Sequence, residues 1–437
     1  MATITVPWGK HENLSIELPA SWMVKAELKP RRPEERPTLA EALDRALAKP
    51  IGSPRLSEFA KRGKSAAVVV DDRTRPTPVA GIMPKVLAEL NAAGVEDKNI
   101  TVVMGLGTHR PMTEPEIKER VGPAVLARVR CENHDYQDPA KLKEVGRTPT
   151  HGIPVTFNQR VVEADTVVVV GTIEAHEQAG FGGGYKGLMP GVAGEAPITF
   201  THNYDFQKVN LIASAGLPRE KCRFRQAVDE AGQLLGPKVF IVNTILDPVE
   251  VIEVVAGDPI SAWNYGSERV RAMNQVEIPG LADIVIADSH PLDTDLRVAM
   301  KSCFYSAMAL KPGGVFIGIL RAEEGLGDLR VPEGLPPFAK LLIKVLPLSL
   351  LRKVSDRLPI SPDQRAGSFS FTRMMKSFHV LFYVTSMPAV AGFQNLGVEF
   401  FQDIPALIAR ARALQPGPAE VLVFPQGGAT FVKVDSR

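Results

Sequence analysis

The sequence predicts an α/β fold, because short apolar runs recur along its 437 residues with helical patterns between them. The runs are rich in Val and Ile, and turn residues bound each of them, as expected of buried strands. The predicted strands are Ser65–Val70, Ile100–Gly105, Asp165–Gly171, Lys238–Leu246, Asp283–Ala287, Gly314–Leu320, His379–Val384 and Glu420–Phe424.

Helical patterns occupy several of the intervals. Pro78–Gly94 has apolar residues at helical spacing and ends on a glycine that can form a left-handed cap. Thr113-Glu-Pro-Glu116 is a capping box with proline in the first turn, so another helix should begin there. Residues 20–50, rich in Pro, Glu, Lys and Arg, predict a surface excursion with a short helix at Leu39–Ala48. The apolar segment Lys340–Arg352 predicts a kinked, half-buried helix too short to cross a bilayer, because Pro347 interrupts it.

We predict two α/β domains with a cofactor and substrate cleft between them. The junction is expected near Glu277–Leu281, where Ile278-Pro-Gly ends one helical pattern before a new strand. An N-terminal domain would then span residues 1–277 and a C-terminal domain residues 278–414. The final strand, within residues 415–437, could rejoin the N-terminal domain.

The composition narrows the function classes. Fifty-one basic and 49 acidic residues leave a formal charge of +2, with both signs interspersed, so neither nucleic acid nor a membrane is an expected partner. Cys131, Cys222 and Cys303 are far apart, which argues against a disulfide framework and a structural zinc site and fits a reducing cytoplasm. The first residues lack the pattern of an export signal. We therefore expect a cytoplasmic protein with a small-molecule partner.

Charged residues and histidines follow the predicted strands. Asp71-Asp72-Arg73-Thr74-Arg75-Pro76 comes directly after the first strand, and Gly105-Leu-Gly-Thr108-His109-Arg110 follows the second. If these strands are neighbours, His109 should lie beside Asp72 and Arg75. An arginine fork suits a carboxylate or phosphate, although the same run could also be a salt-bridged turn.

A glycine-rich stretch follows the third strand. Glu174 and His176 should emerge at the strand's carboxyl end, and then come Gly180-Phe-Gly182-Gly183-Gly184-Tyr-Lys186-Gly-Leu-Met-Pro-Gly191 and His202. The stretch fits neither a Rossmann fingerprint nor a P-loop, because Met-Pro-Gly cannot open a helix and no Ser or Thr follows Lys186. It predicts a loop that holds a reactive lysine over a flat, anionic group.

A further candidate helix lies after the strand Asp283–Ala287. Asp293, Arg297 and Lys301 are four residues apart and would share one helical face. The face could be a solvated one with ion pairs, but its position at a strand edge favours a role in the cleft.

Taken in order, these motifs resemble the nickel-dependent lactate racemase family. The matching pieces are Asp72-x-x-Arg75-Pro, Gly-x-Gly-Thr-His109-Arg, His176 with the glycine loop and Lys186, His202, and Pro-Leu-Asp-x-x-Leu-x-x-x-x-Lys301, spread from about residue 65 to 305. The resemblance implies an isomerase that racemises or epimerises a 2-hydroxyacid. It also implies a nickel-pincer nucleotide, pyridinium-3,5-bisthiocarboxylic acid mononucleotide nickel, and cofactor-synthesis proteins as partners.

The resemblance also implies roles for these residues. Lys186 would form a thioamide with the cofactor, His202 would bind nickel, and Thr108 with Gly182, Gly183 and Gly184 would contact the cofactor. His109 and His176 would flank the substrate and alternate as acid and base, and Arg75 and Lys301 would grip its carboxylate and hydroxyl. Asp72 would orient its neighbours. The chemistry is reasonable, since the α-hydrogen of a 2-hydroxyacid is a poor acid and leaves more easily as hydride while a base removes the hydroxyl proton.

The chain departs from lactate-type members at two positions. Val298 stands three residues before Lys301, where a Gln is usual, and Arg297 replaces an aromatic residue. A polar contact is lost and a cation is gained, which predicts a substrate other than lactate, bulkier or more acidic.

Two other functions remain open from the sequence. One is a zinc-dependent hydrolase using His109, His176 and His202, and the other is a non-catalytic carrier of a modified nucleotide.

Overall fold

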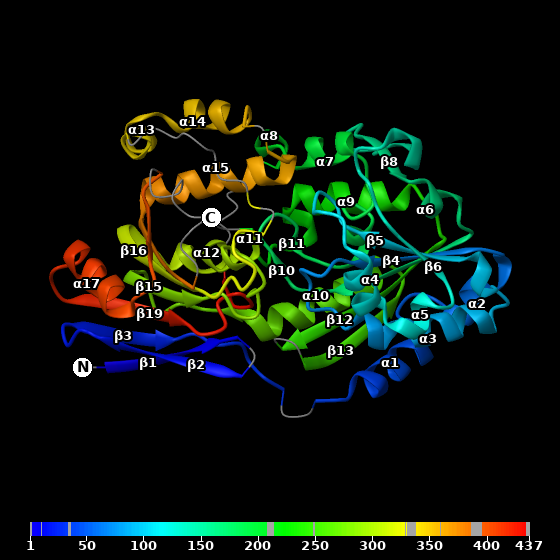
Figure 1. Cartoon of the computed structure of the whole chain (residues 1–437), viewed down its shortest axis with the longest axis horizontal. Helices are drawn as coiled ribbons and strands as arrows, with labels where there is room; N and C mark the ends of the chain where they lie inside the picture. The colour runs from blue at the N-terminus through cyan, green and yellow to red at the C-terminus, as the bar shows by residue number, and fades with distance from the viewer. Residues whose placement is uncertain are drawn as a thin grey trace.

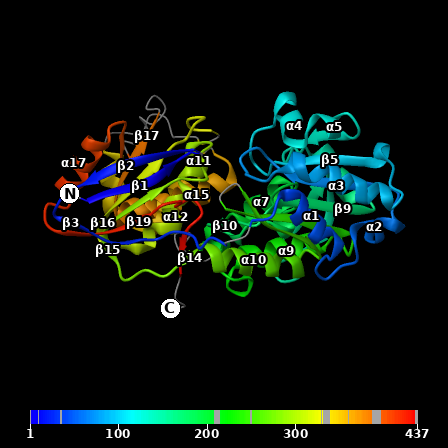
Figure 2. The ribbon, with the colours of Figure 1, turned by 90° about the horizontal axis from the view of Figure 1, so that it is seen from below.

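Two six-stranded sheets form the framework of the computed structural model (Figures 1 and 2). The structure describes residues 2–9, 11–33, 36–207, 214–247, 250–327, 329, 338–358, 360–385 and 396–433. All eight strands predicted from the sequence are present, with ends that differ by a few residues at most. The protein therefore has the predicted α/β fold.

The first sheet has the strand order β13-β12-β9-β4-β5-β6. Only β13 is antiparallel to its neighbour. The strands are β13 (Glu250–Gly257), β12 (Val239–Asp247), β9 (Thr166–Thr172), β4 (Ala66–Asp71), β5 (Ile100–Gly105) and β6 (Arg130–Asn133). Because β4 lies between β9 and β5, the segments that follow these three strands leave the same edge of the sheet.

Both faces of the first sheet are buried, which explains its valine-rich strands. In β9, Val168 and Val170 pack into the core under α1, α3, α4 and α5, whereas Val167 and Val169 pack into the core on the other face, with α9 and α10. The helices are α1 (Leu39–Ala48), α2 (Leu56–Phe59), α3 (Val79–Ala92), α4 (Glu114–Val121), α5 (Pro123–Leu126), α6 (Gln159–Glu163), α9 (Arg223–Gln233) and α10 (Ser261–Asn274).

The second sheet is parallel throughout, with the order β18-β17-β16-β15-β19-β3. Its strands are β18 (Val398–Phe401), β17 (His379–Val384), β16 (Leu310–Leu320), β15 (Ala282–Asp288), β19 (Ala419–Phe424) and β3 (Trp22–Glu27). The hairpin of β1 (Ala2–Trp8) and β2 (Glu12–Leu18) packs on one face with α17 (Ile404–Leu414). On the other face lie α12 (Lys301–Ser306) and α15 (Pro362–Ser377).

The local signals for helices are also confirmed. Thr113 caps α4 with a capping box, and α1 has the predicted bounds. Gly94 follows α3 with a φ of 96°. The segment around Pro347 forms two helices, α13 (Ala339–Val345) and α14 (Leu348–Ser355), separated at the proline. No helix among the described residues is both long and apolar enough to cross a membrane.

One prediction about the N-terminal region is wrong. Residues 20–50 are not simply a surface excursion, because β3 forms an edge strand of the second sheet beside β19. Trp22 is buried in its core. The domain boundaries 1–277 and 278–414 remain a prediction. The sheet that contains β15 also includes β3, and β20 (Phe431–Val432) pairs with β14 (Gln275–Val276).

Candidate active site

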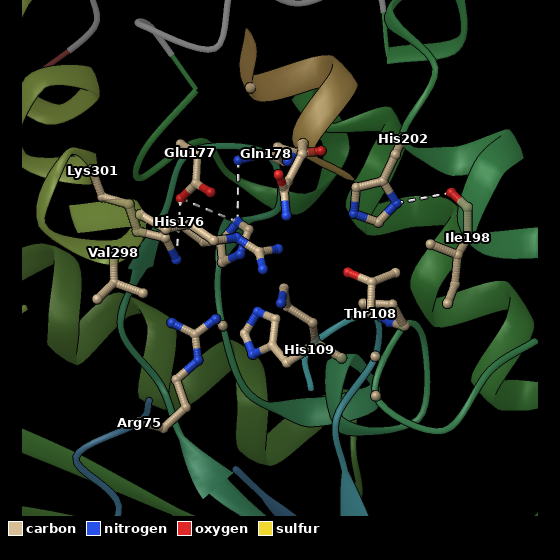
Figure 3. Close-up of a pocket in the computed structure, with 18 of the residues that line it drawn as sticks. Arg75, Thr108, His109, His176, Glu177, Gln178, Ile198, His202, Val298 and Lys301 are labelled. Atoms are coloured by element: carbon tan, nitrogen blue, oxygen red, sulfur yellow. Dashed lines mark hydrogen bonds and ion pairs between the residues drawn. The ribbon is translucent and has the colours of Figure 1, made fainter. Parts of the chain in front are cut away.

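A single cavity of about 320 Å³ collects the segments that follow β4, β5, β9 and β15. Twelve of the residues predicted from the sequence line it, and Figure 3 shows several of them around a common space. They are Asp72, Arg75, Thr108, His109, His176, Gly182, Gly183, Gly184, Lys186, His202, Arg297 and Lys301. Both sheets therefore contribute residues to one cavity.

His109 lies against Asp72 because β4 and β5 are parallel neighbours. The Asp72 carboxylate contacts Nδ1 of His109 and also accepts from the backbone and side chain of Thr74, at 2.8 and 2.5 Å. Burial opposes ionisation, but His109 and Arg75 hold the pKa of Asp72 well below its usual value. The ionised carboxylate can only accept, so Nδ1 of His109 carries a proton, and the lone pair of the neutral ring is on Nε2.

Arg75 is held by the acidic side chain that follows β9. Its Nη1 lies 2.7 Å from Oε1 of Glu174. Burial works against the charge, yet Glu174 and Asp72 raise the pKa of Arg75 above its usual value. Arg75 is therefore a fixed cation in the wall of the cavity.

His176 has the opposite hydrogen bonding from His109. It is 5% exposed on the short strand β10 (Ala175–His176), and its Nδ1 accepts from the backbone N–H groups of Gln178, at 3.1 Å, and Ala179, at 3.3 Å. Burial, with Lys186 and Lys301 nearby, holds its pKa well below the usual value. His176 is thus a neutral imidazole with its proton on Nε2.

The glycine loop is supported from behind by buried polar side chains. Trp263 donates from Nε1 to the carbonyl of Gly182, at 2.7 Å, and Asn243 accepts from the N–H of Gly184, at 2.8 Å. Arg225, fully buried over the Trp263 ring, donates to the carbonyl of Gly183. A Cβ at Gly184 would lie 2.6 Å from the Arg225 guanidinium. The loop is therefore fixed in position, and only glycine fits there.

Lys186 lies in the short 3-10 helix Gly184–Gly187 that ends this loop. Burial, with Arg75 and Lys301 nearby, lowers the pKa of its amine to about 7. An amine with such a pKa is largely an uncharged nucleophile just above neutral pH.

His202 caps the C-terminal end of α7 (Glu195–Thr201). Its Nδ1–H donates to the carbonyl of Ile198, at 2.8 Å, and its ring packs edge-on against Phe224. The neutral ring therefore carries its lone pair on Nε2, the nitrogen that faces the cavity in Figure 3. This tautomer suits a metal ligand, since a carbonyl partner at the other nitrogen is the usual arrangement for metal-bound histidines.

Lys301 begins α12 and extends toward Glu177, with 3.7 Å between Nζ and Oε2 (Figure 3). The predicted helical face is only partly correct. Asp295 caps the preceding helix, α11 (Leu296–Ala299), by accepting from the N–H of Val298. Asp293 therefore lies before the helix, where it contacts Ser289 and His290 instead.

Glu177 and Gln178 line the cavity beside His176 and were not identified from the sequence. Glu177 has a buried Oε2 without a hydrogen-bond partner among the described residues, and this atom lies beside Lys301 and His176. Gln178 is 7% exposed, and its Oε1 accepts from Nε2 of Gln207, at 2.8 Å, which leaves its amide N–H groups for the cavity. The sequence offered one sign that they belong to the site, because both directly follow His176.

The zinc-hydrolase alternative requires three converging ligands. Across the described residues, which include His109, His176 and His202, no three His, Cys, Asp or Glu side chains are grouped so that they could hold a metal ion. A metal held by His202 would therefore need ligands other than a cluster of described His, Cys, Asp or Glu side chains.

The known proteins that this chain resembles in sequence and in structure are lactate racemases. The family model for the lactate racemase N-terminal domain matches residues 9–212. The chain is 30% identical over 332 residues to a lactate racemase of Thermoanaerobacterium thermosaccharolyticum, covering 75% of this chain and 76% of that one. It is 28% identical over 399 residues to a lactate racemase of Lactiplantibacillus plantarum, with 90% and 91% covered. The structure of the lactate racemase apoprotein from T. thermosaccharolyticum is similar with a TM-score of 0.84 at 25% identity, covering 99% of this chain and all of that one.

The fold, the cavity and these relatives define an α/β enzyme of the isomerase class. The chain belongs to the lactate racemase family, and it is a racemase.

Proposed function

We propose that the protein racemises or epimerises a 2-hydroxyacid by moving a hydride between the substrate and a nickel-pincer nucleotide, through a 2-oxoacid. One observation carries the proposal: His109 and His176 share a cavity with a metal-competent His202 and a lysine of lowered pKa. This combination suits proton transfer at a hydroxyl beside a covalently anchored metal group.

The residues present fit such a cofactor. Lys186 has the uncharged amine that a thioamide bond requires, and His202 directs Nε2 toward the cavity as a nickel ligand. The glycine backbone from Gly182 to Gly184, with Thr108 on the neighbouring loop, provides a surface that lies close to a flat ring. When bound, the nickel-pincer nucleotide supplies an acceptor for the hydride that leaves C2, which no side chain can provide.

The remaining residues bind and orient the substrate. The Arg75 cation and the Lys301 amine are suited to the carboxylate and hydroxyl, and Glu174 fixes the direction of the arginine fork. Nε2 of His109 is positioned to take the hydroxyl proton, and Asp72 stabilises the imidazolium that results. His176 flanks the substrate from another segment of the cavity wall.

We further propose that lactate is not the preferred substrate. Val298 is 2% exposed and lines the cavity together with Arg297, so this part of the wall offers an apolar contact and an additional cation. A bulkier or more acidic 2-hydroxyacid suits both. Cofactor-synthesis proteins in the cytoplasm are the partners that such an enzyme requires.

Protein made beside the cofactor-synthesis genes tests the proposal. We expect nickel, a mass increment on the intact chain and racemisation of an enantiopure 2-hydroxyacid. Lys186→Ala should remove the increment, and Lys98→Ala is the matched control because Lys98 is exposed. An increment without turnover would support the carrier alternative, and an increment that persists in Lys186→Ala would refute the anchor.

A further inference from the structure

Glu177 and Gln178 are two buried polar residues in the cavity wall that the proposed reaction does not use. They directly follow His176 at the end of β10, and Glu177 is 8% exposed and Gln178 7%. Both line the cavity. Burying a polar group that has no hydrogen-bond partner costs free energy, and a bound ligand that supplies the partner removes this cost.

The orientation of the Gln178 amide is fixed by Gln207. Nε2 of Gln207 lies 2.8 Å from the carbonyl oxygen of Thr201 and 2.8 Å from the Gln178 side chain. Because a carbonyl can only accept, Gln207 presents its NH₂ group here, and the Gln178 atom that faces it must be the oxygen Oε1. The NH₂ group of Gln178 therefore points away from Gln207, into the space between His176 and His202 (Figure 3).

This NH₂ group has no acceptor among the described residues, although the Gln178 side chain is buried. A ligand in the cavity can therefore accept hydrogen bonds from it. The donor is uncharged and already oriented, so it suits an uncharged acceptor such as a hydroxyl oxygen. The substrate's carboxylate has better partners in the charged fork of Arg75 and in Lys301.

Glu177 lies beside the residues that are proposed to hold the substrate. Its Oε2 is 3.7 Å from Nζ of Lys301 and 3.7 Å from Nδ1 of His176, and it accepts no hydrogen bond from the described residues. A substituent beyond C2 of a substrate held by these two residues would extend along the same wall. A carboxylate such as Glu177 accepts hydrogen bonds and repels a second carboxylate, so it favours a hydroxyl over a further acidic group there.

We propose that Glu177 and Gln178 recognise hydroxyl groups of the substrate beyond C2, so that the substrate is a 2,3-dihydroxyacid or a longer polyhydroxy acid. A hydroxyl can both accept from Gln178 and donate to Glu177. An alkyl chain would leave both residues buried without partners, and an ionised second carboxylate could not donate. The proposal rests on the proposed function, and between bulkier and more acidic substrates it selects a bulkier, hydroxylated one.

Matched substrates test this preference. Glycerate is lactate with one further hydroxyl, on C3, and malate carries a second carboxylate on that carbon instead. We expect the cofactor-loaded protein to racemise enantiopure glycerate with a kcat/KM at least about tenfold above the values for lactate and malate, because a site built to bind a hydroxyl discriminates strongly against analogues that lack it. Equal values, or a preference for lactate or malate, would overturn the proposal.

Two substitutions assign the preference to these residues. Gln178→Leu keeps the size of the side chain and removes its donors, so the glycerate-to-lactate ratio of kcat/KM should fall by about tenfold, mainly through KM for glycerate. Glu177→Gln removes the charge that repels a second carboxylate, so the ratio of malate to glycerate should rise by about tenfold. Gln233→Leu is the control, because Gln233 is exposed on α9 and does not line the cavity. A glycerate-to-lactate ratio that Gln178→Leu leaves unchanged would contradict the assignment.

Binding can be measured apart from turnover. 3-Hydroxypropanoate and propanoate differ by the same hydroxyl, and neither has a stereocentre to invert, so isothermal titration of the protein as it is isolated compares their affinities directly. We expect 3-hydroxypropanoate to bind at least about tenfold more tightly than propanoate, and Gln178→Leu to remove the difference. A wild type that binds both acids equally, or neither, would refute the hydroxyl contact.

The same samples separate this inference from the proposed function. A wild type without nickel, mass increment or turnover would overturn the proposed function, while tighter binding of 3-hydroxypropanoate that Gln178→Leu abolishes would still support the hydroxyl contact. A nickel-loaded racemase that prefers lactate or malate would overturn the hydroxyl contact alone. Loss of nickel and of the mass increment in Gln178→Leu would place Gln178 at the cofactor and would also overturn it.

Discussion

Asp72, at the end of β4, contacts Nδ1 of His109, at the end of β5, and the two side chains meet because these strands are parallel neighbours. Thr74 provides two further hydrogen bonds that hold the carboxylate in place. The contact fixes the His109 tautomer and with it the nitrogen that faces the cavity.

Asp72→Asn should lower kcat for a 2-hydroxyacid by roughly 10²-fold or more in both directions. The amide can donate to Nδ1, and this would place the His109 proton on Nε2, where a base is needed. Initial rates from each enantiomer, followed by chiral chromatography, measure the effect. Thr74→Ala is the control for loss of packing, and a fully active Asp72→Asn would contradict the role of Asp72.

Acylation of Lys186 should depend on pH in an unusual way. Its pKa is lowered to about 7, so the fraction of uncharged amine, and the acylation rate, should rise through pH 6–8 and then level off. Exposed Lys98 has a raised pKa because it hydrogen-bonds with Glu96, and its rate should still be rising well above pH 8. Peptide mass spectrometry of the apoprotein after brief acetylation compares the two. Parallel profiles would show that the cavity does not activate Lys186.

His202→Ala should reduce the nickel content of the cofactor-loaded protein by about tenfold or more. The variant removes the Nε2 ligand and leaves Lys186 in place, so the covalent mass increment should survive while nickel is lost. His379, on β17 outside the cavity, provides the control His379→Ala. Metal analysis and intact mass on the same samples decide the result, and unchanged nickel in His202→Ala would exclude His202 as the ligand.

Specificity should respond to Val298, because its side chain is buried in the cavity wall. The wild type should prefer a 2-hydroxyacid other than lactate. Val298→Gln adds an amide that can bind a charged group, which should shift the ratio of kcat/KM values toward lactate on the order of tenfold. A panel of enantiopure 2-hydroxyacids measures both. Lactate as the best wild-type substrate, or an unchanged ranking, would show that Val298 does not set specificity.

Much of this fold could be predicted because its strands are continuous apolar runs buried on both faces. The same regularity predicted the position of the cavity, since side chains after β4, β5 and β9 must leave one edge of a parallel sheet. The strand β3 was missed because Trp22–Glu27 alternates between buried and more exposed residues and lies at an edge. Its pairing with β19, almost 400 positions later in the printed sequence, leaves no local trace.

The orientations and proton positions of the site residues depend on tertiary contacts, which the spacing of residues along the sequence does not reveal. Asp293 and Lys301 suggested one helical face, but Asp295 offered a better N-cap and started the helix later. The orientation of Gln178 depends on Gln207, 29 residues away, and no pattern links them. The proton positions on His109 and His176 likewise follow from partners that only the folded chain brings together.

Retention of the C2 hydrogen tests the central claim most directly. The cofactor-loaded enzyme is given an enantiopure 2-hydroxyacid with deuterium at C2 in ordinary water. The product enantiomer is then separated, and mass spectrometry measures its deuterium content. If a hydride is transferred and returned, the product keeps its deuterium, because the C2 deuterium does not exchange with water. Replacement of the deuterium by hydrogen from water would mean that C2 is deprotonated by a base, and would contradict the account.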